Sequence, residues 1–97
     1  MRLKEYYDEA FTLKFYTKNN FVLYLNTDGE FVEEPELRYI KMYYNEFDLN
    51  VNIDSFINAA KEYNKTHQSD PIIRCNVTIL DITVTARQSI IGRIINN

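Results

Sequence analysis

The chain has 97 residues and a net charge of −3, which is enough sequence for one small domain with its own hydrophobic core. Its single cysteine, Cys75, excludes an internal disulfide, and its two glycines exclude a glycine-rich phosphate-binding loop. No apolar run reaches the roughly 18 residues that a membrane-spanning helix needs. We therefore expect one cytoplasmic domain, residues 1–97, that contacts no membrane and binds no cofactor.

The first half of the chain alternates apolar and polar residues in the manner of β-strands. Residues 1–10 precede this pattern and fit either a short helix or an extended lead-in. Residues 11–16 and 21–25 predict a hairpin whose Phe and Leu side chains face a common core. The Asp28-Gly29 pair predicts a type I′ turn before a short return strand. Residues 37–53 then alternate in two runs, of which 37–47 is the longest strand-like segment of the chain.

The clearest helical pattern covers residues 54–68. Asp54 or Ser55 can cap the first turn, and Pro71 prevents the helix from continuing. One stripe of this helix is apolar and must be buried against another element. The predicted stripe consists of Phe56, Ala59, Ala60, Tyr63 and, at its end, His67.

The last quarter of the chain is again strand-like. Apolar residues fall on odd numbers from Ile73 to Ile79 and on even numbers from Leu80 onward, which predicts a β-bulge near Leu80 or a tight reversal near Asp81. The isoleucine-rich tail, residues 88–97, has the spacing of a short helix, although isoleucine also favours strands. Together the elements predict an α+β fold, in which an antiparallel sheet of about five to six strands carries one main amphipathic helix (54–68) on one face.

Groups that could carry catalysis or bind a metal are few. The only histidine, His67, and the only cysteine, Cys75, would need each other and an orienting third group for nucleophilic chemistry, and a zinc site needs three or four such ligands. The oxygen-bearing residues between Asp48 and Asp54 imitate a calcium loop but are not followed by the glycine and glutamate that such a loop requires. We therefore expect no catalytic residue, no metal site and a non-enzymatic protein.

Acidic residues and tyrosines concentrate in residues 28–54, which carry a charge of −6. Tyrosine is enriched where proteins recognise proteins, and carboxylates steer such a surface onto a basic partner. An equally weighted alternative is that the tyrosines cover an open sheet face and the acids keep it soluble. The predicted partner-binding surface consists of Asp28, Glu30, Glu33, Glu34, Glu36, Tyr39, Tyr43, Tyr44, Glu46 and Asp48.

These patterns favour a protein-interaction module that binds a basic protein surface. One concrete version is a small inhibitor from a phage or mobile element that blocks a nucleic-acid-binding host enzyme, as anti-CRISPR proteins do. The first alternative is a homodimeric structural or assembly protein joined through residues 80–97. A further alternative is a small single-stranded nucleic-acid-binding domain, although the acidic charge argues against direct contact with phosphates. An enzyme with an unfamiliar site would instead require a deep pocket with convergent polar groups.

Overall fold

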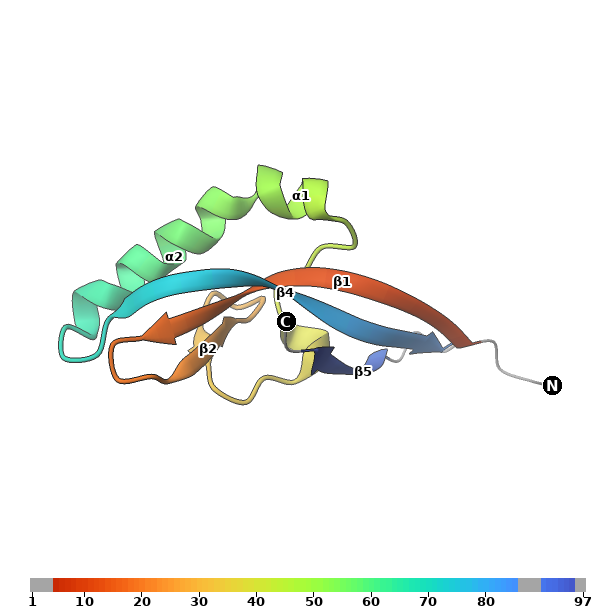
Figure 1. The fold of residues 1–97 in the computed structure, drawn as a ribbon, viewed down its shortest axis with the longest axis horizontal. Coiled ribbons are helices and arrows are strands. Elements are labelled where there is room, and N and C mark those ends of the chain that lie inside the picture. The colour runs from red at the N-terminus through yellow and green to blue at the C-terminus, as the bar shows by residue number, and fades with distance from the viewer. Residues whose placement is uncertain (1–4, 86–89, 96–97) are drawn as a thin grey trace.

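Two long antiparallel strands form the centre of the fold in the computed structural model, which describes residues 5–85 and 90–95, with side chains described for residues 9–81. Strand β1 (Glu5–Thr17) pairs with β4 (Ile72–Thr85) along nearly its whole length. The other strands are β2 (Val22–Leu25), β3 (Phe31–Val32) and β5 (Ile90–Ile95). The sheet order is β3-β2-β1-β4-β5, with every pair antiparallel (Figure 1).

The predicted class is confirmed, because the molecule is α+β with one antiparallel sheet and one main helix. Four of the strands have four residues or more, and β3 adds only two residues at the edge. The predicted five to six strands are therefore slightly more than the structure contains. The excess comes from residues 37–53, which were expected to be strands.

The main helix is α2 (Ile53–Thr66), which begins one residue earlier and ends two residues earlier than the predicted range. Asn52 is its N-cap residue in place of Asp54 or Ser55, and the Ser55 hydroxyl donates to the Asn52 carbonyl oxygen at 2.7 Å. Phe56 and Ala60 are buried, and Ala59 and Tyr63 pack beside them, so the predicted apolar stripe is confirmed up to Tyr63. His67 lies beyond the helix at its C-cap and is exposed.

The helix covers one face of the sheet through a core that the β1–β2 hairpin supplies. Phe15 pairs with Leu23 across this hairpin, and both are buried against Phe56. The hairpin was predicted, and its turn contains Asn20 in the left-handed region at a φ of 69°. At the next turn, Gly29 alone has a positive φ, of 84°, so the predicted type I′ geometry is wrong even though the return strand forms.

A second, smaller core lies on the opposite face of the sheet. Ala10 and Leu80 are directly paired and are covered by Ile40, with Leu37 and Met42 beside them. The covering segment includes the short 3₁₀ helix η1 (Leu37–Tyr39), which lies across the sheet from α1 and α2 (Figure 1). Both faces of the sheet are therefore covered, but at different positions along β1 and β4.

This arrangement explains the change of apolar phase in β4. The pairs Phe11↔Ile79 and Ala10↔Leu80 follow one another without a break, so the predicted bulge or reversal near Leu80 is wrong. The register shift lies instead between Tyr16 and Thr17, opposite Ile73. The buried face of β4 changes because the segment that covers the strand changes from α2 to the η1 segment. The strand itself continues without interruption.

Two further predictions are corrected by the hydrogen bonds of residues 37–51. Residues 37–47 include η1 and isolated bridges at Ile40 and Tyr43, because their backbone groups bond single residues of other segments, such as Phe11 in the middle of β1, and not a continuous strand. Residues 46–51 form helix α1 (Glu46–Val51) in place of a strand, and Asn45 caps it by accepting from the Asp48 N–H at 2.8 Å.

The described parts of the end segments 1–10 and 88–97 are also extended, although their sequence allows a short helix; residues 1–4, 88–89 and 96–97 lie outside the described residues. Residues 5–10 belong to β1, because they pair with residues 80–85 of β4. Residues 90–95 form β5, which pairs with residues 79–84 of β4. At both ends the partner strand supplies hydrogen bonds that a short terminal helix would have to make alone.

Candidate functional site

The structure distributes the ten predicted partner-binding residues over several parts of the surface. Asp28 and Glu30 lie at the β2–β3 turn, and Glu33, Glu34, Glu36 and Tyr39 follow the chain from β3 into η1. Tyr44, Glu46 and Asp48 lie at α1, across the sheet from η1. The ten residues therefore do not form the single continuous face that the sequence suggested.

Tyr43 is the one member of the set that packs into the interior. Its ring meets the ring of Phe56 edge to face, with 6.2 Å between the centroids, and it borders the core beneath α2. Its backbone exchanges two hydrogen bonds with Phe11, at 2.7 and 2.9 Å. Tyr43 therefore joins the α1 region to β1. The other nine residues are exposed.

The acids and Tyr39 near η1 form a small local cluster. The Arg38 guanidinium lies 3.3 Å from a Glu36 carboxylate oxygen and 4.7 Å from the centroid of the Tyr39 ring. All three side chains are exposed, so the pair contributes little to stability. The local cation also offsets part of the acidic charge that would attract a basic partner.

A different grouping appears at α1, where two large apolar side chains of the helix and one just before it project into solvent. Tyr44 is 53% exposed, Phe47 is 74% exposed and Val51 is 65% exposed. Phe47 and Val51 are four residues apart on one helix and therefore lie next to each other. We call Tyr44, Phe47 and Val51 the α1 patch. None of the three packs against either hydrophobic core.

The helix itself is held in place from its other side. Leu49 is fully buried in the core beneath α2, and the Asn45 side chain caps the first turn. Because Leu49 lies between Phe47 and Val51 in sequence, helical geometry turns it away from both of them. The α1 patch is therefore displayed on an anchored element.

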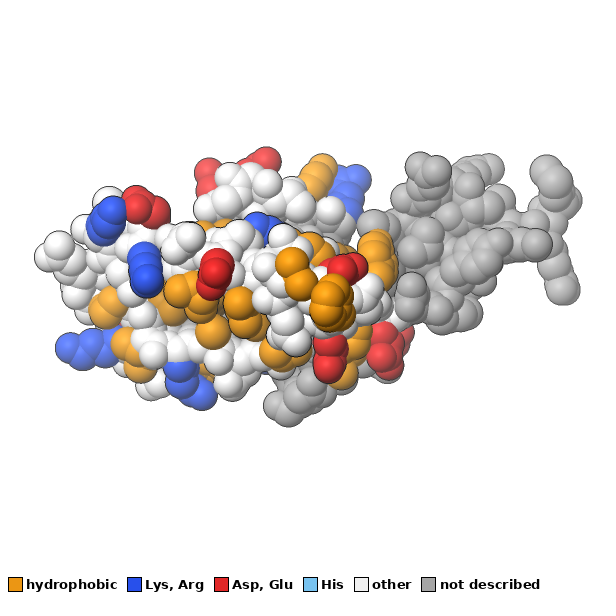
Figure 2. All heavy atoms as spheres, turned by 90° about the horizontal axis from the view of Figure 1, so that it is seen from above, with side chains coloured by type: hydrophobic (Ala, Val, Ile, Leu, Met, Phe, Trp, Pro, Cys, Tyr) orange, Lys and Arg blue, Asp and Glu red, His pale blue; other side chains and the backbone are white. Residues whose placement is uncertain are grey.

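The surroundings of the α1 patch are acidic. Glu46 and Asp48 lie in the first turn of α1, no basic residue lies in its last turn, and Asp54 follows in α2. The nearby Lys41 donates from Nζ to the Ser55 hydroxyl at 2.7 Å and lies 5.1 Å from the centroid of the Phe56 ring. Figure 2 looks down on this side of the molecule and shows hydrophobic side chains at the surface beside acidic ones.

Sequence reasoning included Tyr44, Glu46 and Asp48 but missed Phe47 and Val51. Both were assigned to strands, in which their exposure could not be inferred. The signal that could have located them is Asn45 with Asp48 three residues later, because this pattern caps a helix start.

The two side chains considered for nucleophilic chemistry lie on different sides of α2. The His67 ring stacks on the Tyr63 ring with 3.7 Å between centroids, at a hollow of about 590 Å³ beside Gly29 and Phe31. Cys75 lines a separate groove beside Ile57 and Ile73. Burial raises the pKa of the Cys75 thiol above its ordinary value, which favours the neutral thiol over the thiolate.

The described part of the chain also bears on other kinds of site. Residues 9–81 contain no group of three or more His, Cys, Asp or Glu side chains placed to hold a metal ion. Neither α1 nor α2 has the length and apolar character that a membrane-crossing helix needs. The candidate site that the geometry supports is therefore the α1 patch with its acidic surroundings.

Comparison with known proteins provides no family for the chain. No protein-family model matches it, and neither a curated protein nor a solved structure matches it significantly.

Proposed function

We propose that the protein is a non-enzymatic interaction module that binds a basic protein surface through the α1 patch. The observation that supports this most strongly is the exposure of Phe47 and Val51 on a helix anchored by buried Leu49, with exposed Tyr44 just before that helix. Single exposed apolar residues are ordinary, but adjacent ones on an anchored element are typical of contact surfaces.

The physical chemistry of the α1 patch suits a protein partner. Burying a Phe or Val side chain contributes about 1.5–3 kcal/mol, and aromatic residues are enriched at the centres of protein interfaces. Glu46, Asp48 and Asp54 would form an acidic rim around this apolar centre. Such a rim accelerates encounter with a basic surface and disfavours acidic partners.

A partner of this kind could be a nucleic-acid-binding enzyme, because such enzymes have basic grooves for phosphates. In this version the protein is a small inhibitor of the phage or mobile-element type and occupies the groove in place of nucleic acid. The charge of −6 in residues 28–54 and the acidic rim of α1 support this version.

The proposal is tested by affinity capture from the native host with matched variants. The Phe47→Ala variant removes the centre of the α1 patch. The Phe21→Ala variant makes the same change at the β1–β2 turn, where Phe21 is 49% exposed. We expect a partner captured by the wild type to bind Phe47→Ala about tenfold more weakly or worse, and Phe21→Ala with unchanged affinity.

A salt titration separates the apolar and acidic contributions to binding. Reversal of Glu46 to Lys should weaken binding at low salt, and the difference from the wild type should shrink as ionic strength rises. Reversal of Glu33, Glu34 and Glu36 together tests the remaining acids of the predicted surface. Equal capture by the wild type and Phe47→Ala, with both proteins folded, would rule out the α1 patch as the binding surface.

A further inference from the structure

The outer edge of β4 has an uncovered stretch beside α2. Strand β5 pairs with Ile79–Val84, and no other described strand lies beside residues 72–77 on the side away from β1. Exposed strand edges pair readily with another extended chain. From this edge and its surroundings we infer that the protein binds an extended, acidic and apolar segment of a partner protein, which adds to the sheet beside β4.

The backbone direction at this edge follows from the hydrogen bonds of β1. Phe11 and Thr17 direct their N–H groups toward Tyr43 and Phe21, on the β2 side of the strand. These directions alternate along a strand of an antiparallel sheet, so the backbone N–H and C=O groups of even-numbered β1 residues point toward β4. There they bond the backbone groups of Arg74 and Asn76, which therefore point toward β1. The N–H and C=O groups of Cys75 and Val77 therefore point outward.

At Ile72, the first residue of this edge, a side chain already makes the hydrogen bonds of a neighbouring strand. The Asn64 side chain of α2 accepts from the Ile72 N–H at 2.7 Å and donates to the Ile72 carbonyl oxygen at 3.0 Å. These are the two bonds that a neighbouring strand would make at Ile72. They hold α2 at a defined distance from β4, and the outward groups of Cys75 and Val77 begin three residues further on.

A groove of about 200 Å³ lies between α2 and this edge. Its apolar lining includes Ile57, Ala60 and Ile73, and Cys75 contributes to its wall. Ile73 is 61% exposed, and Val77 further along the edge is 41% exposed. An added strand would direct alternate side chains toward this groove, which suits apolar residues at those positions.

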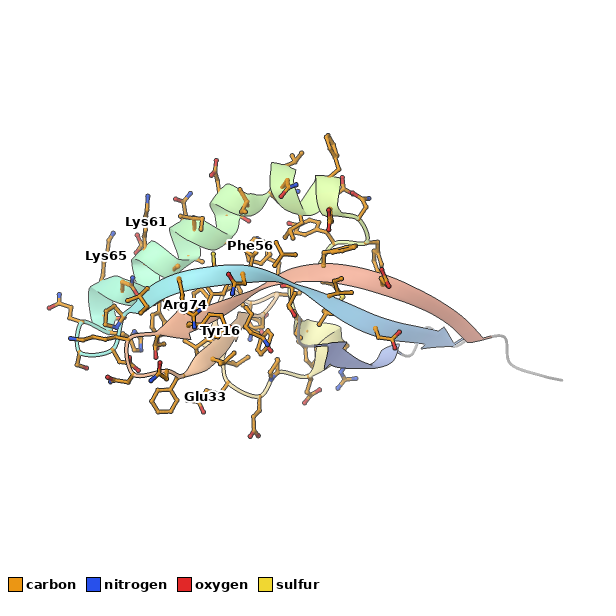
Figure 3. All side chains as sticks on the ribbon, viewed as in Figure 1. Tyr16, Glu33, Phe56, Lys61, Lys65 and Arg74 are labelled. Carbon is orange, nitrogen blue, oxygen red and sulfur yellow. The ribbon has the colours of Figure 1, made fainter. Side chains whose placement is uncertain are left out.

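The charged residues around the groove favour an occupant of negative charge. Lys61 and Arg74 belong to its lining, which contains no carboxylate. Figure 3 shows Lys61 on α2 above β4 and Arg74 below it beside Tyr16, where the guanidinium lies 3.9 Å from the ring centroid. A strand added at this edge would lie near both cations, which favours acidic side chains. A second copy paired about a two-fold axis would instead bring like charges together.

The test uses the full-length protein and a synthetic peptide of seven alternating valine and glutamate residues with blocked ends. Amide hydrogen exchange is followed by NMR. At a peptide concentration of about ten times its Kd, the Cys75 and Val77 amides should exchange about tenfold more slowly. The Arg74 and Asn76 amides, which bond β1, should not change. A matched peptide of valine and lysine should bind more weakly.

Two charge-reversal variants test whether the cations beside the groove attract the acidic peptide. Lys61→Glu should weaken binding of the glutamate peptide about fivefold, whereas Arg38→Glu, on the η1 side, should leave it unchanged. Phe47→Ala should also leave it unchanged, so this test is separate from that of the α1 patch. The inference is overturned if Cys75 and Val77 gain no protection, or if both peptides bind equally. It is also overturned if these amides become protected as the concentration of free protein rises, since a second copy would then occupy the edge.

Discussion

At the scale of single residues, Asn64 shows how a side chain can replace a strand. A carboxamide has one donor and one acceptor group with the spacing of a peptide group. Here both groups bond Ile72, at 3.0 and 2.7 Å, and the contact is partly buried. The bonds attach α2 to the first residue of β4, eight positions later in the chain.

Removal of this contact should destabilise the protein. We expect Asn64→Ala to lower the free energy of unfolding by about 1–3 kcal/mol, because the Ile72 backbone groups lose their partner. The matched variant is Asn58→Ala, which makes the same change at an exposed position of the same helix and should have an effect within about 0.5 kcal/mol. Urea unfolding measures both values. Similar effects of the two variants would show that the Ile72 contact contributes little.

At the scale of elements, the two helices divide structural and surface roles between them. Phe56 of α2 is fully buried and stacks with Phe15 at 6.4 Å between ring centroids. Phe47 of α1 is 74% exposed. The two residues are nine positions apart in the chain, and only the packing of each helix distinguishes them.

This division predicts opposite outcomes for the same substitution. Phe56→Ala should lower the free energy of unfolding by about 3–5 kcal/mol, because it leaves a cavity between α2 and the sheet. Phe47→Ala should change it by no more than about 0.5 kcal/mol. Thermal and urea unfolding measure both effects. A strongly destabilised Phe47→Ala protein would show that α1 packs differently and that its patch is not free for a partner.

At the scale of the whole molecule, each part of the sheet has its own cover. Helices α1 and α2 lie on one face, and the η1 segment covers Ala10 and Leu80 on the other. Strand β5 protects residues 79–84 of the β4 edge, whereas residues 72–77 remain without a described neighbouring strand. Removal of β5 would therefore uncover the whole outer edge of β4.

A chain ending at Arg87 tests this role of β5. We expect the shortened protein to be less stable and to self-associate in light scattering, because an uncovered strand edge pairs with other chains. The homodimer alternative makes a different prediction, in which the full-length protein is a dimer and the shortened protein is a monomer. Monomers of equal stability in both cases would show that β5 does not protect this edge.

The sequence alone determined the features that depend on local pattern. The apolar stripe of α2, the β1–β2 hairpin and the return strand after Asp28-Gly29 were predicted because residues a few positions apart decide them. The exposure of the seven acidic residues of the predicted surface also follows from local chemistry, since charged groups lose hydration on burial.

Tertiary structure decided the features that depend on distant partners. The alternation of Leu49, Val51 and Ile53 fits a strand as well as a helix turn, and contact with the core beneath α2 selects the helix. The exposure of Phe47 follows from that choice. The phase change at Leu80 depends on Ile40, forty residues away, because the segment that crosses the sheet determines which face is buried.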